Sequence, residues 1–372
     1  QSFGGSSLSS PMAPSHWRLI SAHLALGFAT ITFSAWNVLA ESVTGQGPGA
    51  LLVSALRDVT SVLCLGVVSL LREQCSHLAH PNRALLAEEC RVPGEILTCR
   101  RPRARRDWFL IAAVGLAGPF LAPVGSILCD TWSSGNTNAI LNALTPACTG
   151  LFAALLGIDR PSWCLALALL LACAAGLVAV NSATSSLESE KPAAERVAGI
   201  LAGLMAMLSQ ALFYVFMHPL QKPHRGRPPL DALALITHAY FFAATASVVG
   251  CAVAVATTDF GVCSWLESSG GRQLFLSLYA GAVCGALNFA LITWACESVQ
   301  ITICALYGVM QPPVTALLAL AAKGESLEKG GLISGALALA SLLCATVGPS
   351  LMATRHEVSC CAPEVGAEVE RT

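Results

Sequence analysis

Long apolar stretches, separated by short polar segments, recur along almost the whole chain. A helix needs about 20 mostly apolar residues to cross a bilayer core. Ten stretches qualify, numbered here as spans one to ten: 17–39, 50–71, 108–129, 135–157, 162–181, 197–218, 232–255, 273–295, 299–322 and 330–353. Helices of soluble proteins have an apolar and a polar face, whereas these stretches are apolar on nearly every side. The pattern predicts an all-α membrane protein with ten transmembrane helices.

Composition supports this class of protein. Of the 372 residues, 55% are hydrophobic and only 12% are charged, against about 25% charged in soluble domains. The net charge of −1 argues against nucleic acid as a partner. The 16 cysteines are scattered, with no CxxC pair and no histidine cluster at ligand spacing. The sequence therefore predicts no disulfide framework, no metal site and no cofactor.

The basic residues predict the orientation, because cytoplasmic loops carry an excess of Lys and Arg. With the N-terminus inside, 15 of the 21 basic residues lie on the cytoplasmic side, eight of them between spans two and three, around "CRRPRARRDW". Both termini are expected in the cytoplasm. Which membrane holds the protein is not indicated.

Prolines and charged residues recur in the same order in the two halves of the chain. Two proline-to-acid pairs share a spacing of 13 residues, and two proline-to-basic pairs a spacing of nine: Pro146–Asp159 and Pro312–Glu325, then Pro48–Arg57 and Pro229–His238. Repetition in order indicates internal duplication. We expect five-helix halves at 17–181 and 197–353, a polar linker at 182–196, and tails at 1–16 and 354–372. Because five is odd, the halves should have inverted orientations, as in many transporters.

At this point the sequence resembles a known family. "NTNAILNALTPACTGLFAALLGIDRP" and "TICALYGVMQPPVTALLALAAKGESL" look like the two signature segments of the EamA-type drug/metabolite transporter superfamily, and "LLVSALRDVTSV" is similar to its second span, where an arginine is common at the place of Arg57. The resemblance extends from about residue 17 to 353. It implies ten helices in two inverted halves, and export or exchange of small organic metabolites. Asp159 departs from the pattern, which has glutamate there.

Polar side chains in a membrane helix usually face the bundle interior or water, so they are candidate site residues. Two polar stripes precede the prolines of spans four and nine: Asn138, Asn142 and Thr145 at i, i+4, i+7, and Gln300, Cys304, Tyr307 and Gln311 at i, i+4, i+7, i+11. The alternative for such residues is interhelical hydrogen bonding. The predicted substrate-binding residues are Trp36, Asn37, Asn138, Asn142, Tyr214, Asn288, Tyr307 and Gln311.

The prolines themselves are expected to bend their helices toward a central cavity, the alternative being kinks in packed helices. The predicted kink residues are Pro146, Pro312 and Pro313. Asp159 and Glu325 are expected to cap loops at the membrane edge. The glycine pairs of "GAVCG" and "GLISG" suit close helix contact within the chain or in a homodimer.

Intramembrane charge is sparse: Arg57, Asp58 and His238. Arg57 either binds a carboxylate or pairs with an acid, and the structural role is favoured. His238 and His23 are candidates for proton coupling, although a lone histidine is more often a packing residue.

The sequence thus predicts a transporter, embedded in lipid, for a small neutral or zwitterionic organic solute. A sugar-phosphate or nucleotide-sugar exchanger is the nearest alternative, but phosphate binding usually needs several basic side chains, and the spans offer only Arg57. An intramembrane enzyme would need a nucleophile with a base, or paired acids, at membrane depth; no GxSxG or HExxH sequence is present, and no enzyme activity is expected. A non-transporting membrane scaffold is the remaining alternative.

Overall fold

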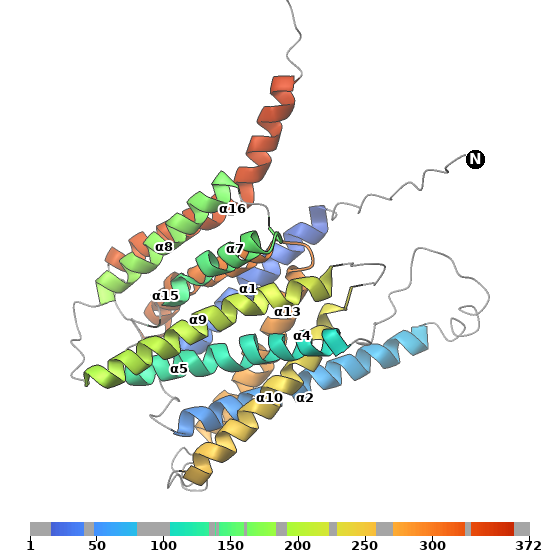
Figure 1. Ribbon diagram of the computed structural model, residues 1–372, viewed down its shortest axis with the longest axis vertical. Helices are drawn as coiled ribbons and strands as arrows, with labels where there is room; N and C mark the ends of the chain where they lie inside the picture. Colours follow the sequence, from blue (N-terminus) through green and yellow to red (C-terminus); the bar gives the residue numbers. More distant parts are fainter. Residues whose placement is uncertain are drawn as a thin grey trace, which may run out of the picture.

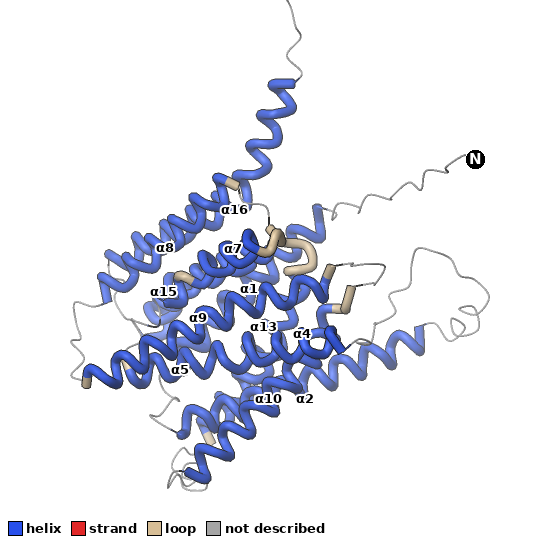
Figure 2. Tube along the Cα trace, in the orientation of Figure 1, coloured by secondary structure: helices blue, strands red, loops and turns tan. Residues whose placement is uncertain are grey.

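The computed structural model describes residues 16–40, 48–79, 105–133, 138, 141–159, 162–183, 192–222, 229–257, 271–323 and 329–360. Within these ranges the chain is helical and contains no strand (Figure 2). Seven helices in the described part are long and apolar enough to cross a membrane, by length and composition. Three shorter apolar helical stretches, Leu141–Leu155, Trp163–Val178 and Leu332–Val347, lie within spans four, five and ten. The prediction of an all-α membrane protein is confirmed, whereas ten crossings and inverted halves stay predictions.

Six of the expected spans are continuous helices. They are α1 (His16–Ala40), α2 (Pro48–Ala79), α8 (Trp163–Ala183), α9 (Ala193–Gln221), α10 (Ala232–Thr257) and α16 (Lys329–Cys360). Their apolar residues reach the surface in helical register: Leu24, Phe28 and Ile31 of α1, for example, are exposed on one face. Such a face suits contact with lipid tails rather than water.

Spans three and eight change helix type midway. Span three runs as α4 (Arg105–Gly115), the π-helical segment η1 (Leu116–Leu121) and α5 (Ala122–Trp132). Span eight runs as α12 (Arg272–Tyr279), the π-helical segment η3 (Ala280–Leu287) and α13 (Asn288–Ala295). Segments of π-helix are rare and frequently occur at functional sites. The sequence analysis did not predict either of them.

Spans four and nine are interrupted. Span four contains helical residues 141–143, a turn at Leu144, and then α7 (Thr145–Leu155). Span nine is formed by α14 (Ile301–Leu306), the short 3₁₀ segment η4 (Tyr307–Met310) and α15 (Gln311–Lys323). Both interruptions come directly before the prolines singled out in the sequence.

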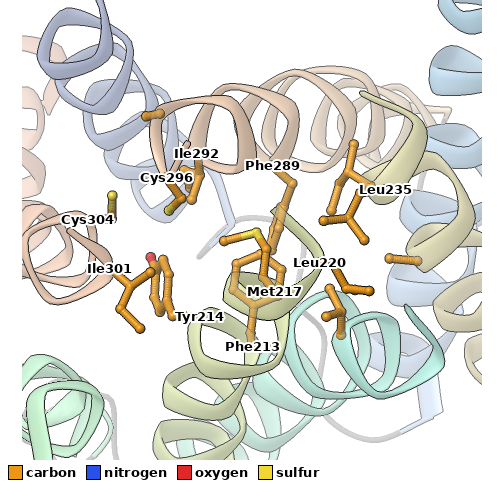
Figure 3. Close-up of a cluster of buried hydrophobic side chains, with 14 of the residues drawn as sticks. Phe213, Tyr214, Met217, Leu220, Leu235, Phe289, Ile292, Cys296, Ile301 and Cys304 are labelled. Atoms are coloured by element: carbon orange, nitrogen blue, oxygen red, sulfur yellow. The ribbon is translucent and has the colours of Figure 1, made fainter. Parts of the chain in front are cut away.

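The helices are arranged as a row of pairs (Figure 1). The α8–α16 pair lies at one end of the molecule and the α2–α10 pair at the other, with the remaining helices between them. In the middle, α1 packs on α13 and α15, whereas α9 packs on α5 and α7. The interior between these helices is an aromatic and aliphatic core, in which the Phe289 ring meets the Phe213 ring edge-on at a centroid distance of 5.5 Å (Figure 3).

Small residues let the central helices approach closely. A Cβ added at Gly115 of α4 would lie 2.0 Å from the backbone oxygen of Ala239 in α10. A Cβ at Gly281 of η3 would lie 2.5 Å from the backbone oxygen of Arg57 in α2, and one at Gly335 would lie 3.1 Å from Pro313. These three glycines therefore serve contacts within one chain, which is one of the two roles expected for the "GAVCG" and "GLISG" pairs.

We expect Gly115→Ala to destabilise the protein, because its methyl group would collide with backbone atoms that cannot rotate away. Overpacking of this kind costs about 1–3 kcal/mol. The matched control is Gly250→Ala in α10, where no atom lies within 4 Å of the added Cβ. Thermal stability of the purified variants, followed by size-exclusion chromatography, should fall for Gly115→Ala and not for Gly250→Ala. Equal stability of the two variants would contradict the close contact.

Candidate functional site

The break in span four follows from the chemistry of Pro146. A helical residue at this position would donate its N–H to the carbonyl of Asn142, and proline has no N–H to donate. The helix instead turns at Leu144, and α7 restarts with Pro146 in its first turn, where a missing donor costs nothing. The carbonyl of Asn142 is thereby released from the usual helical pattern.

The break in span nine has the same cause, and hydrogen bonds from a neighbouring helix compensate for it. Pro312 and Pro313 cannot donate to the carbonyls one turn earlier, and the preceding residues form the tighter η4 segment. Hydroxyl groups of α1 donate to backbone oxygens on both sides of the break: Thr30 Oγ1 to Tyr307 O (3.3 Å) and Ser34 Oγ to Gln311 O (3.1 Å). The interrupted helix is therefore supported by its neighbour.

Asn142 lies on the inner face of span four and is nevertheless exposed. It continues the line of Asn138, Thr145 and Thr149, all three of which are buried. Its amide nitrogen donates to Asn138 Oδ1 at 3.0 Å. The lipid-facing side of α7 carries exposed leucines such as Leu151 instead. The exposed amide of Asn142 is therefore on the opposite side of span four from the exposed Leu151.

Span nine presents a similar inner face. Cys304, Gly308, Gln311 and Thr315 follow one another at i, i+4, i+7 and i+11, opposite the exposed Leu317. Gly308 is exposed and Gln311 is partly exposed, although both lie on this inner side. The segment η4 packs against α7. The broken parts of spans four and nine are therefore neighbours, and each carries an amide side chain that is at least partly exposed.

Tyr307 and Tyr214 lie next to this region, where the packed core begins. The Tyr307 hydroxyl is 2.9 Å from His23 Nδ1 of α1. Tyr214 of α9 is buried and shares a hydrogen bond with the side chain of Gln210. Figure 3 shows Tyr214 close to Ile301, with its ring on the α9 side of the cluster. We call the side of spans four and nine that carries Asn142, Gly308 and Gln311 the inner polar face. The two tyrosines lie between this face and the apolar core.

Charged side chains connect helix ends that the basic residues of the sequence predict to be cytoplasmic. Arg18 Nη2 lies 2.8 Å from Glu297 Oε2, and Arg72 Nη1 lies 2.7 Å from Asp231 Oδ2. Lys222 Nζ donates to the backbone oxygen of Glu297 at 3.1 Å. Burial raises the pKa of the Glu297 carboxyl above its usual range, although Arg18 acts in the opposite direction. We call this set of contacts the closed end.

Asp159 also belongs to the closed end. It is buried at the end of span four, and its Oδ2 accepts the N–H (3.2 Å) and the hydroxyl (2.7 Å) of Thr302 in the first turn of α14. A carboxylate in this place satisfies a helix N-terminus as an N-cap does, but here the cap comes from another span. Glu325, the corresponding acid of the second half, lies outside the described residues.

Arg57 and Asp58 form a polar cluster inside the membrane-spanning region. Their side chains are paired at 2.7 Å, and Asp58 also accepts a hydrogen bond from Ser247 of α10. Arg57 Nη2 donates to the carbonyl of Pro119 in η1 (2.7 Å), and Ser61 Oγ donates to the carbonyl of Gly281 in η3 (2.9 Å). α2 therefore bonds to backbone oxygens of both π-helical segments. Arg57 thus has an acid and a backbone carbonyl as partners, and its structural role stays a prediction.

Two other predicted residues, Asn288 and Trp36, have their contacts away from the inner polar face. Asn288 is fully buried and joins α13 to α1, because its Oδ1 accepts from Thr32 at 2.7 Å. Trp36 packs beside Val53 and Leu276, and its neighbour Asn37 is exposed.

His238 also lies elsewhere. Its Nδ1 is 2.6 Å from the carbonyl of Ala234 in its own helix, and its ring meets Trp108 edge-on at 5.3 Å. The α10 side chain that reaches the charges of span two is Ser247, not His238.

The contact of His23 with Tyr307 and the two π-helical segments were not predicted from the sequence. Pro119 inside η1 was an available signal, since a proline in an apolar run marks a change in helical hydrogen bonding. η3 contains no proline, and its sequence carries no comparable signal.

Fold and site together define a multi-pass helical membrane protein with interrupted helices at its centre. No protein-family profile matches the chain. It is similar to Protein WALLS ARE THIN 1 of Arabidopsis thaliana, with 29% identity over 143 residues, which are 38% of this chain and 34% of that protein. The chain thus matches about a third of the length of this curated relative. A solved structure described as the crystal structure of a protein matches with a TM-score of 0.65 and 18% identity over 91% of this chain and 99% of that one. This likeness concerns the fold alone.

Proposed function

We propose that the protein is a transporter that moves a small organic solute across a membrane by alternating access of two inverted five-helix halves. The observation that carries the proposal is the matched interruption of spans four and nine. Broken helices in a membrane are tolerated where the freed backbone faces a cavity or other protein groups, and transporters place such breaks at their binding sites. Here each break is accompanied by an inner amide, Asn142 or Gln311.

The packing of the helices supports a two-fold relation between the halves. If span one corresponds to span six, the contacts of α1 with spans eight and nine should reappear as contacts of α9 with spans three and four, and they do. The π-helical segments occupy the corresponding spans three and eight, each followed by one further α-helix of 11 or 8 residues. Irregular segments at corresponding places in the two halves are suitable hinges for a motion in which the halves exchange conformations.

The chemistry of the inner face favours an uncharged or zwitterionic solute. The residues there offer amide and phenol groups, which donate and accept hydrogen bonds without net charge. Arg57 already has Asp58 and the Pro119 carbonyl as partners, so it is not free to bind a phosphate. This argues against sugar-phosphate and nucleotide-sugar substrates.

The described conformation has one end held shut. Along span nine, Thr302 of the closed end precedes Tyr307, and Gln311 follows it. Along span four, the exposed Asn142 lies at the opposite end from Asp159. We infer that Asn142 and Gln311 are accessible from the side away from the cytoplasm in this state, if the basic loops are cytoplasmic.

The proposed orientation makes a direct prediction for Cys75, which is exposed near the end of α2. In sealed right-side-out vesicles, a membrane-impermeant maleimide should label Cys75 only after permeabilisation, because positive loops stay inside. Mass spectrometry of the labelled peptide distinguishes Cys75 from the other cysteines. Equal labelling with and without permeabilisation would invert the topology.

Solute flux in proteoliposomes tests the proposed function itself. Purified protein would be reconstituted and screened for counterflow of a mixture of radiolabelled glutamine, tryptophan, adenosine and glucose, with glucose 6-phosphate as the anionic comparison. Protein-free vesicles give the background. Saturable flux of at least one uncharged or zwitterionic probe is the expected result. Background rates for every probe would count against transport of this solute class, and flux of glucose 6-phosphate alone would favour the exchanger alternative.

A further inference from the structure

His23 is the one histidine in the described part of the chain whose recorded hydrogen bond is to a side chain of a broken span. Its Nδ1 lies 2.9 Å from the hydroxyl of Tyr307, and the two rings are 6.0 Å apart between centroids. Tyr307 is the first residue of η4, the interrupted part of span nine. His23 therefore touches the same break that carries Gln311.

The place of His23 along α1 is also informative. Five residues earlier, Arg18 of the same helix forms the ion pair with Glu297 at the closed end. A helix rises about 1.5 Å per residue, so His23 lies roughly 8 Å further into the bundle. Seven residues later, Thr30 bonds to the carbonyl of Tyr307. His23 thus lies between the closed end and the inner polar face.

The ionisable neighbours of His23 are few. The elements that pack most extensively on α1 are η3, α13, η4 and α15, and the titratable residues they carry are Cys284, Tyr307 and Lys323. Cys284 contacts the carbonyl of Thr32, more than two turns further along α1, and Lys323 is the last residue of α15. Among the described residues, no acid forms an ion pair with His23.

A histidine in these surroundings is suited to bind a proton in one conformation only. Imidazole gains or loses a proton in the physiological pH range. The charged form needs an anion or water around it, and His23 is partly buried without an anion. Opening of the closed end would bring water to it.

We propose that His23 is the proton-binding residue of the transport cycle, taking up a proton when the closed end opens and releasing it when that end closes again. The proposal rests on the proposed transport function. It names the coupling ion as H⁺ and the gate as the contact between α1 and span nine.

The hydrogen bond to Tyr307 can persist in both forms of the ring. In one neutral tautomer Nδ1 accepts the phenol hydrogen. In the imidazolium both nitrogens carry hydrogen, so Nδ1 donates and the phenol oxygen accepts. The phenol hydrogen must then turn to another acceptor. Protonation of His23 therefore changes hydrogen bonding at the break of span nine, next to the inner polar face.

Two native cysteines can report opening of the closed end without a known solute. Cys296 and Cys304 are only 1% and 2% exposed, in the core beside it. The protein in lipid nanodiscs would be treated with N-ethylmaleimide at about pH 7.5 and about pH 5.5, which bracket the ordinary histidine pKa. Labelling of each cysteine would be read by mass spectrometry. Because thiols react more slowly in acid, every rate is compared with that of His23→Gln at the same pH.

The expected result is equal labelling of wild type and His23→Gln at the higher pH, and labelling of Cys296 at least threefold faster in wild type at the lower pH. His238→Gln is the matched control, since His238 bonds to its own helix, and it should behave as wild type. Glu297→Gln and His218→Gln test two other titratable groups at the closed end, since His218 is in the last turn of α9, near Lys222 and Asp159. Both variants should retain the dependence on His23.

Two results would overturn the proposal: an acid response that His23→Gln preserves, or one that Glu297→Gln or His218→Gln abolishes. Absence of any acid response in wild type would also overturn it, while solute flux in proteoliposomes would leave the transport function standing. Conversely, an acid response without flux of any probe would count against transport and against a coupling role for His23.

Discussion

Arg57→Ala should strongly reduce the amount of folded protein in the membrane. The substitution leaves the Asp58 carboxylate, which is 0% exposed, with Ser247 as its only recorded partner, and it removes the donor from the Pro119 carbonyl. Breaking a buried ion pair by removing one member costs about 3–5 kcal/mol. We expect this cost to appear as lower abundance and a lower unfolding temperature, with unchanged solute preference in the remaining folded protein.

Two comparisons distinguish a stranded charge from a lost ligand. Arg57→Met combined with Asp58→Asn removes both charges and should recover much of the lost stability. Arg72→Ala breaks an ion pair whose side chains are 50% and 20% exposed, where the expected cost is below about 1 kcal/mol. If Arg57→Ala instead reached normal abundance and lost only anionic solutes, Arg57 would be a ligand.

Asn142→Ala combined with Gln311→Ala should impair transport with little effect on folding. If each amide gives the solute one hydrogen bond of about 1 kcal/mol, the double variant loses about 2 kcal/mol, roughly a 30-fold drop in kcat/KM. Stability should be nearly unchanged, because Asn142 is exposed, and because the backbone of Gln311, not its side chain, accepts the bond from Ser34. Initial flux and membrane abundance would be measured together.

Asn288→Ala is the matched control for this experiment. Asn288 is also an intramembrane asparagine, but it is fully buried and bonded to Thr32 and to the carbonyl of Ala29. We expect it to lower abundance modestly, since interhelical hydrogen bonds in membranes average about 0.6 kcal/mol, and to leave flux per folded molecule unchanged. Wild-type flux in the Asn142/Gln311 double variant would exclude the inner polar face as the binding site.

The positions of the helices were accessible from the sequence because lipid imposes a simple requirement. Each span must be long and apolar enough to cross the hydrocarbon layer, and the described helices occur within a few residues of the expected stretches, except where α2 and α16 continue beyond them. The interruptions of spans four and nine were also predictable, because proline acts on its own helix through the missing N–H. Pro146 and Pro312 are the second residues of α7 and α15, which follow a turn and a 3₁₀ segment.

What each polar side chain contacts was decided by the tertiary structure. Asn142 and Asn288 are the same residue type in similarly apolar spans, yet one is exposed on the inner face and the other is buried between α1 and α13. Trp36 and His238 likewise have their partners in neighbouring helices or their own turn. In a uniformly apolar helix the sequence does not mark which face meets protein and which meets lipid.

The pairing of distant charges shows the same limit. The sequence by itself determined that Arg57, Asp58, Asp159 and Glu297 are rare charges near or within the membrane, where each needs a partner. Only the packing of spans decided that Asp159 caps Thr302 of span nine, that Glu297 meets Arg18 of span one, and that Arg57 reaches the π-helical segment of span three. The physical reason is that these partners come from other helices, and helix packing depends on the shapes of both surfaces rather than on the pattern within either one.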